Sequence, residues 1–156
     1  MPSLMPSLMP LRPLIDVRVG PWDALRRDAQ FIRTAVFIDE QHIPADLEWD
    51  EADATAIHAV AVDRAGHPLA TGRLLRHAPG MARIGRMAVL KAQRGQGIGR
   101  AVLDALMQVA RERGDLEVVL HAQQSAVLFY AEAGFRARGP MFEEAGIPHI
   151  EMVRTL

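Results

Sequence analysis

Hydrophobic residues in this chain follow two periods, which predict a mixture of helices and strands. Apolar residues recur every three or four positions over Trp22–Phe37 and over Ile98–Arg113, as expected of helices with one buried face. A shorter helix is expected at Ser125–Ala133, where Gly134 ends it. Strands are expected at Leu14–Val19, Ala56–Val62, Leu69–Arg76, Ala82–Leu90, Glu117–His121, Phe135–Arg138 and Ile147–Thr155. Hairpin strands followed by a strand–helix–strand crossover indicate an α+β fold with a mixed sheet.

Length and composition fit one globular domain. The chain has 156 residues, of which 49% are hydrophobic and 24% charged. Residues 1–13 repeat a Met-Pro-Ser-Leu unit whose prolines exclude regular helix, so we expect a flexible tail there and a single domain over residues 14–156. The tail lacks the basic start and long apolar core of a signal peptide, and no apolar run approaches the length of a membrane span. We therefore expect a cytoplasmic protein with no membrane partner.

Charged residues are segregated along the chain. Thr34–Asp63 contains eight acids and no Lys or Arg, whereas Arg64–Leu103 contains eight bases and no acid. One interpretation assigns the basic segment to phosphates and the acidic segment to a cationic amine; in the other, the two segments neutralise each other across the fold or face solvent. The net charge of −1 argues against a general nucleic-acid binder. Cysteine is absent and the six histidines show no metal-ligand spacing, so we expect neither a thiol nucleophile nor a metal site.

The most informative segment is residues 84–100, IGRMAVLKAQRGQGIGR. A strand-like run at Met87–Leu90 leads through a glycine-rich turn into the second long helix. Such a turn binds anions because free N–H groups point outward and the helix dipole adds about half a positive charge. A nucleotide P-loop would need Lys-Ser/Thr, which is missing, and the glycine spacing is one residue short of a dinucleotide fingerprint. Arg94, Gly97 and Gly99 instead fill the pattern Gln/Arg-x-x-Gly-x-Gly/Ala.

This pattern resembles the acetyl-CoA pyrophosphate loop of the GCN5-related N-acetyltransferases, the GNAT superfamily. A second stretch, residues 123–135, resembles the family's Asn-x-x-Ala-x-x-Leu-Tyr-x-x-x-Gly-Phe; Ala126, Tyr130, Gly134 and Phe135 match it, while Gln123 and Phe129 depart from it. Residues 36–41 and 142–152 are similar to the Val-Phe-x-x-Glu-Gln and Gly-Ile-Pro-His-x-x-Met stretches of the ElaA-type branch. Together the loop and the stretch around Tyr130 span roughly the C-terminal half of the chain.

The resemblance implies a GNAT fold, which is a mixed, mostly antiparallel sheet of six to seven strands flanked by about four helices. In that fold a splayed parallel strand pair binds CoA, so acetyl-CoA is the implied co-substrate. The main chain of the strand before the loop would bond pantetheine, and the loop would hold the pyrophosphate. The implied cofactor-binding residues are Met87, Ala88, Val89, Arg94, Gly95, Gln96, Gly97, Ile98, Gly99, Arg100, Gln123 and Phe129.

Acyl transfer from CoA to an amine needs a group that assists the departing thiolate and a group that deprotonates the amine. Tyr130, the only tyrosine in the chain, stands where the family has its general-acid tyrosine. Residue chemistry leaves several candidates for the base, namely Glu40, Glu48, Asp50, His58, Glu143 and His149. Resemblance to the ElaA-type branch implies that Glu40, Gln41 and His149 line the acceptor pocket. We therefore assign catalysis to Tyr130, Glu40 and His149, and substrate binding to Gln41 and Glu143.

The function that we expect is direct transfer of an acetyl group from acetyl-CoA to a primary amine in a ternary complex. The absence of cysteine agrees with a mechanism that needs no covalent intermediate. A small-molecule amine is expected as acceptor ahead of a peptide, with no nucleic-acid partner, and a homodimer is left open. The alternatives are a non-catalytic acyl-CoA-binding or sensor module, an acyltransferase resembling the acyl-homoserine-lactone synthases, and a nicotinamide-dependent reductase.

Overall fold

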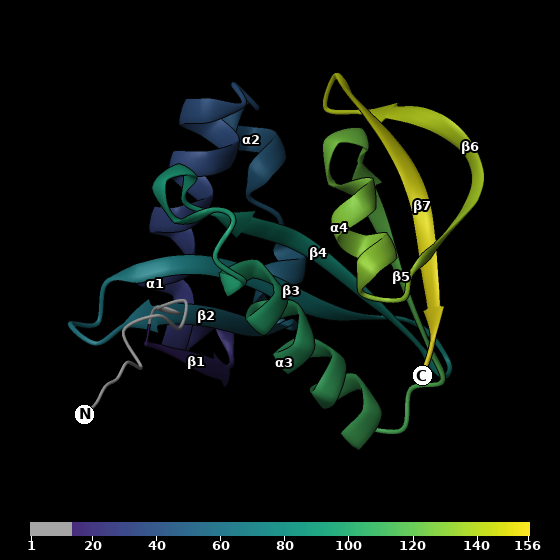
Figure 1. Cartoon of the computed structure of the whole chain (residues 1–156), viewed down its shortest axis with the longest axis horizontal. Helices are drawn as coiled ribbons and strands as arrows, with labels where there is room; N and C mark the ends of the chain where they lie inside the picture. The colour runs from purple at the N-terminus through teal and green to yellow at the C-terminus, as the bar shows by residue number, and fades with distance from the viewer. Residues whose placement is uncertain (1–13) are drawn as a thin grey trace, which may run out of the picture.

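A seven-stranded mixed sheet, with helices on both faces, forms the protein (Figure 1). The structure is a computed structural model and describes residues 14–156; the tail expected over residues 1–13 lies outside the described residues. The sheet order is β1-β2-β3-β4-β5-β7-β6. The strands are β1 Ile15–Gly20, β2 Ile57–Asp63, β3 Pro68–Ala78, β4 Met81–Val89, β5 Glu117–Gln123, β6 Arg136–Glu144 and β7 Ile147–Thr155, and the helices are α1 Trp22–Arg33, α2 Ala45–Glu48, α3 Ile98–Glu112 and α4 Val127–Glu132. The expected α+β fold with six to seven strands and about four helices is confirmed.

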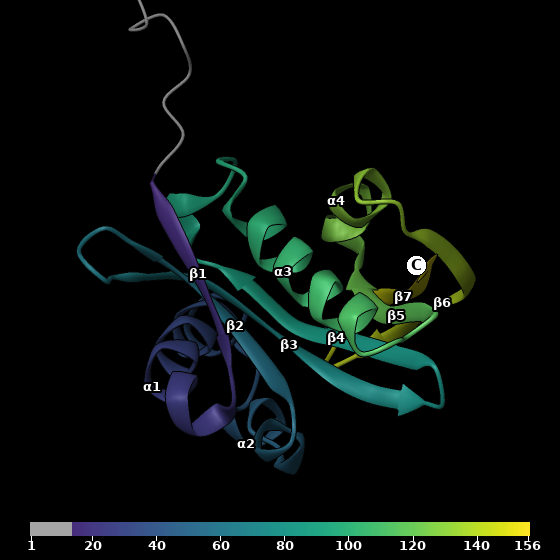
Figure 2. The ribbon, with the colours of Figure 1, turned by 90° about the horizontal axis from the view of Figure 1, so that it is seen from below.

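The helices form two layers, with α1 and α2 on one face of the sheet and α3 and α4 on the other (Figure 2). The apolar stripe predicted for the first helix is buried at Leu25, Ala29 and Ile32. The stripe of α3 is buried in the same way, at Ile98, Val102, Leu106 and Ala110. Burial of one stripe of each helix against the sheet removes apolar area from water, which is the main favourable term in folding. No helix within residues 14–156 is long and apolar enough to cross a membrane.

The first long helix differs from its prediction as a single helix over Trp22–Phe37. The α-helix ends at Arg33 and continues as a π-helix over Thr34–Glu40, closed by a hydrogen bond of 3.1 Å from Gln41 N–H to Val36 O. A π-turn is wider than an α-turn and often occurs at functional sites. The spacing of apolar residues over the seven positions of Thr34–Glu40 is too short to distinguish a π-helix from an α-helix.

The parallel pair β4–β5 separates before either strand ends. Its pairing is confined to Met81 with Glu117, Ala82 with Val118 and Arg83 with Val119. Strand β4 nevertheless continues to Val89 and β5 to Gln123. The splayed parallel pair expected from the sequence is confirmed, and it leaves the backbone of β4 beyond Arg83 unpaired on its β5 side.

A β-bulge in β4 lies at the point where the strands diverge. In the β3–β4 register Arg73 pairs with Gly85 while Thr71 pairs with Ala88, so β4 contains one extra residue there. Arg86 occupies this bulge with φ of 53°, a left-handed conformation that a non-glycine residue rarely adopts. On β3 the facing residue is Gly72, where a Cβ would overlap Met87 Sδ. A larger residue at position 72 would therefore force the Met87 side chain to move.

Candidate active site

The glycine-rich loop folds into a left-handed turn at the start of α3. Gly95 and Gly97 have φ values of 80° and 79°, which glycine adopts without strain. The first hydrogen bond that closes α3 runs from Ala101 N–H to Gly97 O over 3.1 Å. The N–H groups of Ile98 and Gly99 therefore have no partner within the helix, and this end of α3 attracts negative charge.

In front of this turn lies a hollow of about 380 Å³, which we call the loop hollow. It is lined by Val89, Gln93, Arg94, Gly95, Gly97, Ile98, Gly99, Arg100, Phe129 and Glu132. A Cβ built on Gly95 or Gly97 would meet no atom within 4 Å, so the space in front of the loop is open. The free N–H groups at the start of α3 give this hollow the properties of a phosphate site, while its two arginines, Arg94 and Arg100, are paired with Glu40 and Asp104.

Arg94 is held in place by Glu40. Its Nη1 and Nη2 donate to Oε2 and Oε1 of Glu40, each over 2.7 Å, and its Nε donates to Val89 O over 3.0 Å. The hydrogen bond from Arg94 keeps the pKa of Glu40 below its usual range. Glu40, which the sequence assigned to the acceptor side, thus lies against the loop as an ionised carboxylate, and an ionised carboxylate of low pKa is a weak base.

The diverging strands enclose a second, larger space of about 560 Å³, which we call the splay cleft. It is lined by Phe37, Gln41, Ile43, Leu47, Glu48, Asp50, Ala52, Arg73, Leu75, Arg83, Ile84, Gly85, Arg86, Met87, His121, Gln123, Ala126, Tyr130, Glu144, Ala145 and His149. Five residues assigned to the site from the sequence meet here, namely Gln41, Met87, Gln123, Tyr130 and His149, together with two of the other base candidates, Glu48 and Asp50. Ala88 and Gln96, expected to touch the cofactor, line neither space.

Gln41 and Gln123 join the two sides of the splay cleft. Gln123 Nε2 donates to Gln41 Oε1 over 2.9 Å, and Gln41 Nε2 donates to Gln123 Oε1 over 3.4 Å. The first residue follows the π-helix and the second ends β5, 82 positions along the chain. The side-chain amide of Gln123 is thus hydrogen-bonded to Gln41.

Tyr130 enters the splay cleft from α4 with its ring in the main apolar core. Only 7% of the residue is exposed. The ring meets Phe129 and Phe135 edge-on, at centroid distances of 5.0 and 5.9 Å. Burial raises the pKa of Tyr130 well above the ordinary value for a phenol. The hydroxyl therefore remains protonated and able to donate a hydrogen bond throughout the neutral pH range.

His149 lies on β7, buried at the opposite side of the splay cleft. Its Nδ1 is 2.6 Å from Ile147 O, and because a carbonyl accepts hydrogen bonds, Nδ1 carries the proton of the neutral ring. The ring stacks on Phe142 at a centroid distance of 6.0 Å. This arrangement leaves Nε2 with a lone pair, 3.7 Å from Glu144 Oε2.

The β6–β7 hairpin explains why Glu144, rather than the expected Glu143, lines the splay cleft. Phe142 pairs with His149 across the hairpin, and the turn at Ala145 and Gly146 has positive φ values of 53° and 75°. Successive side chains of a strand point to opposite faces. Glu144 therefore shares a face with Phe142 and His149, whereas Glu143 is exposed and points the other way.

Comparison with known proteins identifies the family. Residues 24–156 match the family model described as an acetyltransferase (GNAT) domain. This chain belongs to the GNAT acetyltransferase family. The match covers nearly all described residues, so the resemblance stated from the loop and from the Tyr130 stretch is confirmed.

Relatives of this GNAT protein agree with the assignment. It is 36% identical over 129 residues to YjcF of Bacillus subtilis, named as an uncharacterized N-acetyltransferase, covering 82% of this chain and 91% of YjcF. A solved candidate N-acetyltransferase of Lactobacillus plantarum is 33% identical, with a TM-score of 0.85 over 91% of this chain and 98% of the other. Escherichia coli ElaA is 27% identical, with a TM-score of 0.80 over 90% and 99% of the two chains.

Three residues of the splay cleft in this GNAT protein were missed from the sequence: Arg83, His121 and Glu144. They form a chain in which His121 Nδ1 lies 3.0 Å from Arg83 Nη2 and 3.1 Å from Glu144 Oε1. One signal was available for His121, because it ends the strand predicted over Glu117–His121 and precedes Gln123 by two positions. Since β5 continues to Gln123, the two side chains share a face. No group of three or more His, Cys, Asp or Glu side chains that could hold a metal ion occurs within the described part of the chain.

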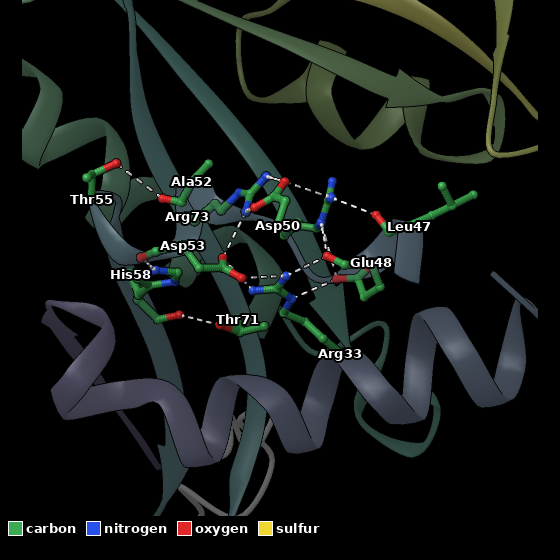
Figure 3. Close-up of polar contacts among 12 residues, drawn as sticks. Arg33, Leu47, Glu48, Asp50, Ala52, Asp53, Thr55, His58, Thr71 and Arg73 are labelled. Atoms are coloured by element: carbon green, nitrogen blue, oxygen red, sulfur yellow. Dashed lines mark hydrogen bonds and ion pairs between the residues drawn. The ribbon is translucent and has the colours of Figure 1, made fainter. Parts of the chain in front are cut away.

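Beneath the splay cleft of this GNAT protein lies a buried network of ion pairs (Figure 3). At its centre is Arg33, the last residue of α1, which is 1% exposed. Its Nε donates to Glu48 Oε2 over 2.7 Å, and its Nη1 donates to Asp53 Oδ1 over 2.8 Å. The Trp22 and Trp49 rings lie near its guanidinium, with centroids 5.5 and 4.9 Å away. Every charge of this inner group thus has a partner.

Two arginines of the basic segment complete the network. Arg73 Nη1 donates to Asp50 Oδ1 over 2.6 Å and to Asp53 Oδ1 over 2.8 Å. Arg86, from the bulge of β4, lies 3.2 Å from both Glu48 Oε2 and Asp50 Oδ2. Burial raises the pKa of Glu48, and Arg33 and Arg86 oppose that effect. The hydrogen bond from Arg73 lowers the pKa of Asp50.

The two charged segments therefore neutralise each other where they meet, which was the second of the two interpretations. Glu48 and Asp50 line the splay cleft but are occupied by arginines, so neither is a free base. His58 does not line the cleft. Its Nε2 lies 2.9 Å from Asp53 O, and burial lowers its pKa. Among the base candidates considered from sequence, His149 is the one with an unoccupied nitrogen in the splay cleft.

Proposed function

We propose that this GNAT protein is an acetyl-CoA-dependent N-acetyltransferase that transfers the acetyl group directly to a small primary amine in a ternary complex. The observation that carries the proposal is the early end of the β4–β5 pairing at Arg83 and Val119, which opens a cleft between an anion-binding loop and Tyr130. Acetyl-CoA supplies an activated acyl group as a thioester. The protein supplies orientation, a hydrogen-bond donor and a base.

The two spaces adjoin along the same elements, as a long cofactor requires. Met87 lines the splay cleft and Val89 lines the loop hollow, both from β4. On α4, Tyr130 lines the splay cleft and Phe129 lines the loop hollow. A CoA whose diphosphate lies on the loop would run along the unpaired side of β4, and its thioester would reach the splay cleft beside Tyr130.

In the transfer the amine nitrogen attacks the thioester carbon, a C–N bond forms and the C–S bond breaks. The sulfur leaves with the electron pair as a thiolate. Tyr130 assists by hydrogen bonding to this sulfur. An ordinary thiol has a pKa of about 8.5, below that of a buried phenol, so stabilisation by a hydrogen bond is the better description of this step than complete proton transfer.

The amine loses its proton to His149 in this proposal. Its Nδ1–H is fixed on the Ile147 carbonyl, so the lone pair of Nε2 faces the splay cleft. Glu40 is the weaker candidate because its carboxylate is bound to Arg94. A cytoplasmic location and a homodimer remain predictions from the sequence.

Gly97→Asp is expected to weaken acetyl-CoA binding by about 10- to 100-fold relative to Gly97→Asn. Both substitutions keep a side chain that tolerates positive φ, and a Cβ at this position would meet no atom within 4 Å. They differ only in the carboxylate, which would repel the diphosphate. Calorimetric titration of both variants and the parent with acetyl-CoA measures the difference. Equal affinity of the two variants would contradict a diphosphate at the loop.

Activity itself is tested by mixing the parent protein with acetyl-CoA and a panel of primary amines, and by following free thiol together with the mass of the acetylated amine. Thiol release that depends on both the amine and the protein supports the transferase. Binding of acetyl-CoA without release for any amine would favour the non-catalytic sensor. Failure of a folded sample to bind acetyl-CoA would overturn the proposal altogether.

His149→Gln is expected to lower kcat/KM for the amine about 100-fold and to remove one limb of its pH profile. Imidazole changes charge between about pH 5 and 8, whereas glutamine does not titrate. The measurement is kcat/KM against pH for the parent and the variant, with His67→Gln as a control on an exposed hairpin histidine. An unchanged profile in His149→Gln would eliminate the base role. His121→Gln tests whether the second imidazole of the splay cleft carries that limb instead.

A further inference from the structure

We propose that the acceptor amine of this enzyme also carries an anionic group, a carboxylate or a phosphate, which Arg83 binds in the splay cleft. This inference rests on the proposed acetyl transfer and specifies the substrate class of the same site. It departs from the idea that an acidic surface attracts a simple cationic amine, because the acids concerned are already paired with arginines.

Arg83 occupies the base of the splay cleft. It is the last residue of β4 that pairs with β5, so its side chain lies where the strands begin to separate. Its only hydrogen-bond partner among the described residues is His121, at 3.0 Å from Nη2 to Nδ1. Its Nε and Nη1 make no hydrogen bond to residues 14–156. A cation with unused donors is therefore directed into a space of substrate size.

The other arginines of the splay cleft are already neutralised. Arg73 is paired with Asp50 and Asp53, and Arg86 with Glu48 and Asp50. Arg83 has no carboxylate within ion-pair distance among the described residues. The planar fork of a guanidinium matches carboxylate and phosphate groups, which accept two parallel hydrogen bonds. An anion of the substrate would supply the counter-charge that the protein itself does not.

A carboxylate lies on the other side of the same imidazole. Glu144 Oε1 is 3.1 Å from His121 Nδ1, and Glu144 Oε2 is 3.7 Å from His149 Nε2. His121 Nδ1 can accept from Arg83 or donate to Glu144 but cannot do both, and the two distances place Arg83 Nη2 and Glu144 Oε1 no more than about 6 Å apart. A short zwitterion fits this arrangement, with its ammonium group near Glu144 and His149 and its anionic group at Arg83. Amino acids and small aminoalkyl phosphonates have that chemistry.

The test compares substrates of equal size that differ in charge. The probes are β-alanine with β-alaninamide, glycine with glycinamide, and aminoethylphosphonate, with kcat/KM expressed per concentration of unprotonated amine. The parent is expected to prefer each acid to its amide by about tenfold or more. A higher kcat/KM for β-alanine than for aminoethylphosphonate would indicate a carboxylate substrate, and the reverse order would indicate a phosphate or phosphonate substrate.

Arg83→Gln is expected to lower the ratio of kcat/KM for the acid to that for the amide by about 10- to 100-fold. Arg76→Gln is the matched control, because Arg76 is exposed on the opposite face of the neighbouring strand and has no ion pair among the described residues. It removes the same charge and is expected to keep the parental ratio. Arg83→Lys should recover part of the ratio, because a single cation remains.

The possible results distinguish failure of the anionic acceptor from failure of the transferase activity. Faster transfer to the amides than to the acids in the parent would overturn the anionic acceptor and leave the transferase standing. An equal loss for acid and amide in Arg83→Gln would also overturn it, since it would indicate that Arg83 only positions His121. Transfer to no amine by a protein that binds acetyl-CoA would overturn the proposed function and this inference with it.

Discussion

Replacing Arg33 by methionine is expected to lower the free energy of unfolding by about 3 to 5 kcal/mol. The guanidinium is 1% exposed and is bound by Glu48 and Asp53, which are 2% and 3% exposed. Removal of the cation leaves those two carboxylates buried beside each other with less compensation. The cost arises from the uncompensated charges, because a complete buried ion pair contributes little more than well-packed apolar groups would. Urea unfolding followed by circular dichroism measures the change.

Arg27→Met is the control, since it makes the same substitution on the exposed side of the same helix and should change stability by less than about 0.5 kcal/mol. A second variant tests the cause. Adding Glu48→Gln and Asp53→Asn to Arg33→Met removes the buried charges and should recover part of the loss. If Arg33→Met proved as stable as Arg27→Met, the network would not have the energetic role assigned to it.

Tyr130→Phe is expected to lower kcat about 100-fold while the dissociation constant of acetyl-CoA changes less than about twofold. The substitution removes one hydroxyl and preserves the edge-on contacts of the ring with Phe129 and Phe135. The loss is confined to the step in which the sulfur acquires negative charge. Steady-state rates with saturating acetyl-CoA and amine measure kcat, and calorimetry measures the affinity.

The leaving group provides an independent check on this role. An acetyl donor such as p-nitrophenyl acetate expels a weaker base than an alkyl thiolate, so it needs less help from the Tyr130 hydroxyl. The ratio of the kcat of the parent to that of Tyr130→Phe should therefore be smaller with that donor than with acetyl-CoA. A variant that acetylates amines from acetyl-CoA as fast as the parent would show that the hydroxyl has no part in the reaction.

The sequence was most informative where a feature depends on local chemistry. The turn at Gly95 and Gly97 needs left-handed backbone, and glycine at those positions indicates it directly. The buried stripe of α3 follows from its period, and the end of the helix, at Glu112, follows from the glycine at position 114. Local patterns of this kind were therefore enough to predict an anion-binding turn at the start of α3.

Features that depend on distant contacts were not predictable in the same way. Arg33 has the sequence context of a solvent-exposed helix residue, and its partners come 15 and 20 positions later. The bulge at Arg86 changes which side chains of β4 face α3, although nothing in the apolar pattern marks an extra residue. The choice of Glu143 over Glu144 depended on the register of a hairpin, in which one position reverses the face.

The loop hollow and the splay cleft are lined in part by different elements, which matters for changes of acceptor specificity. Strand β4, the loop after it, α3 and α4 line the loop hollow, whereas the hairpin β6–β7 contributes Glu144, Ala145 and His149 to the splay cleft from the edge of the sheet. Exchange of this hairpin between paralogues should therefore alter acceptor choice while donor recognition is inherited intact.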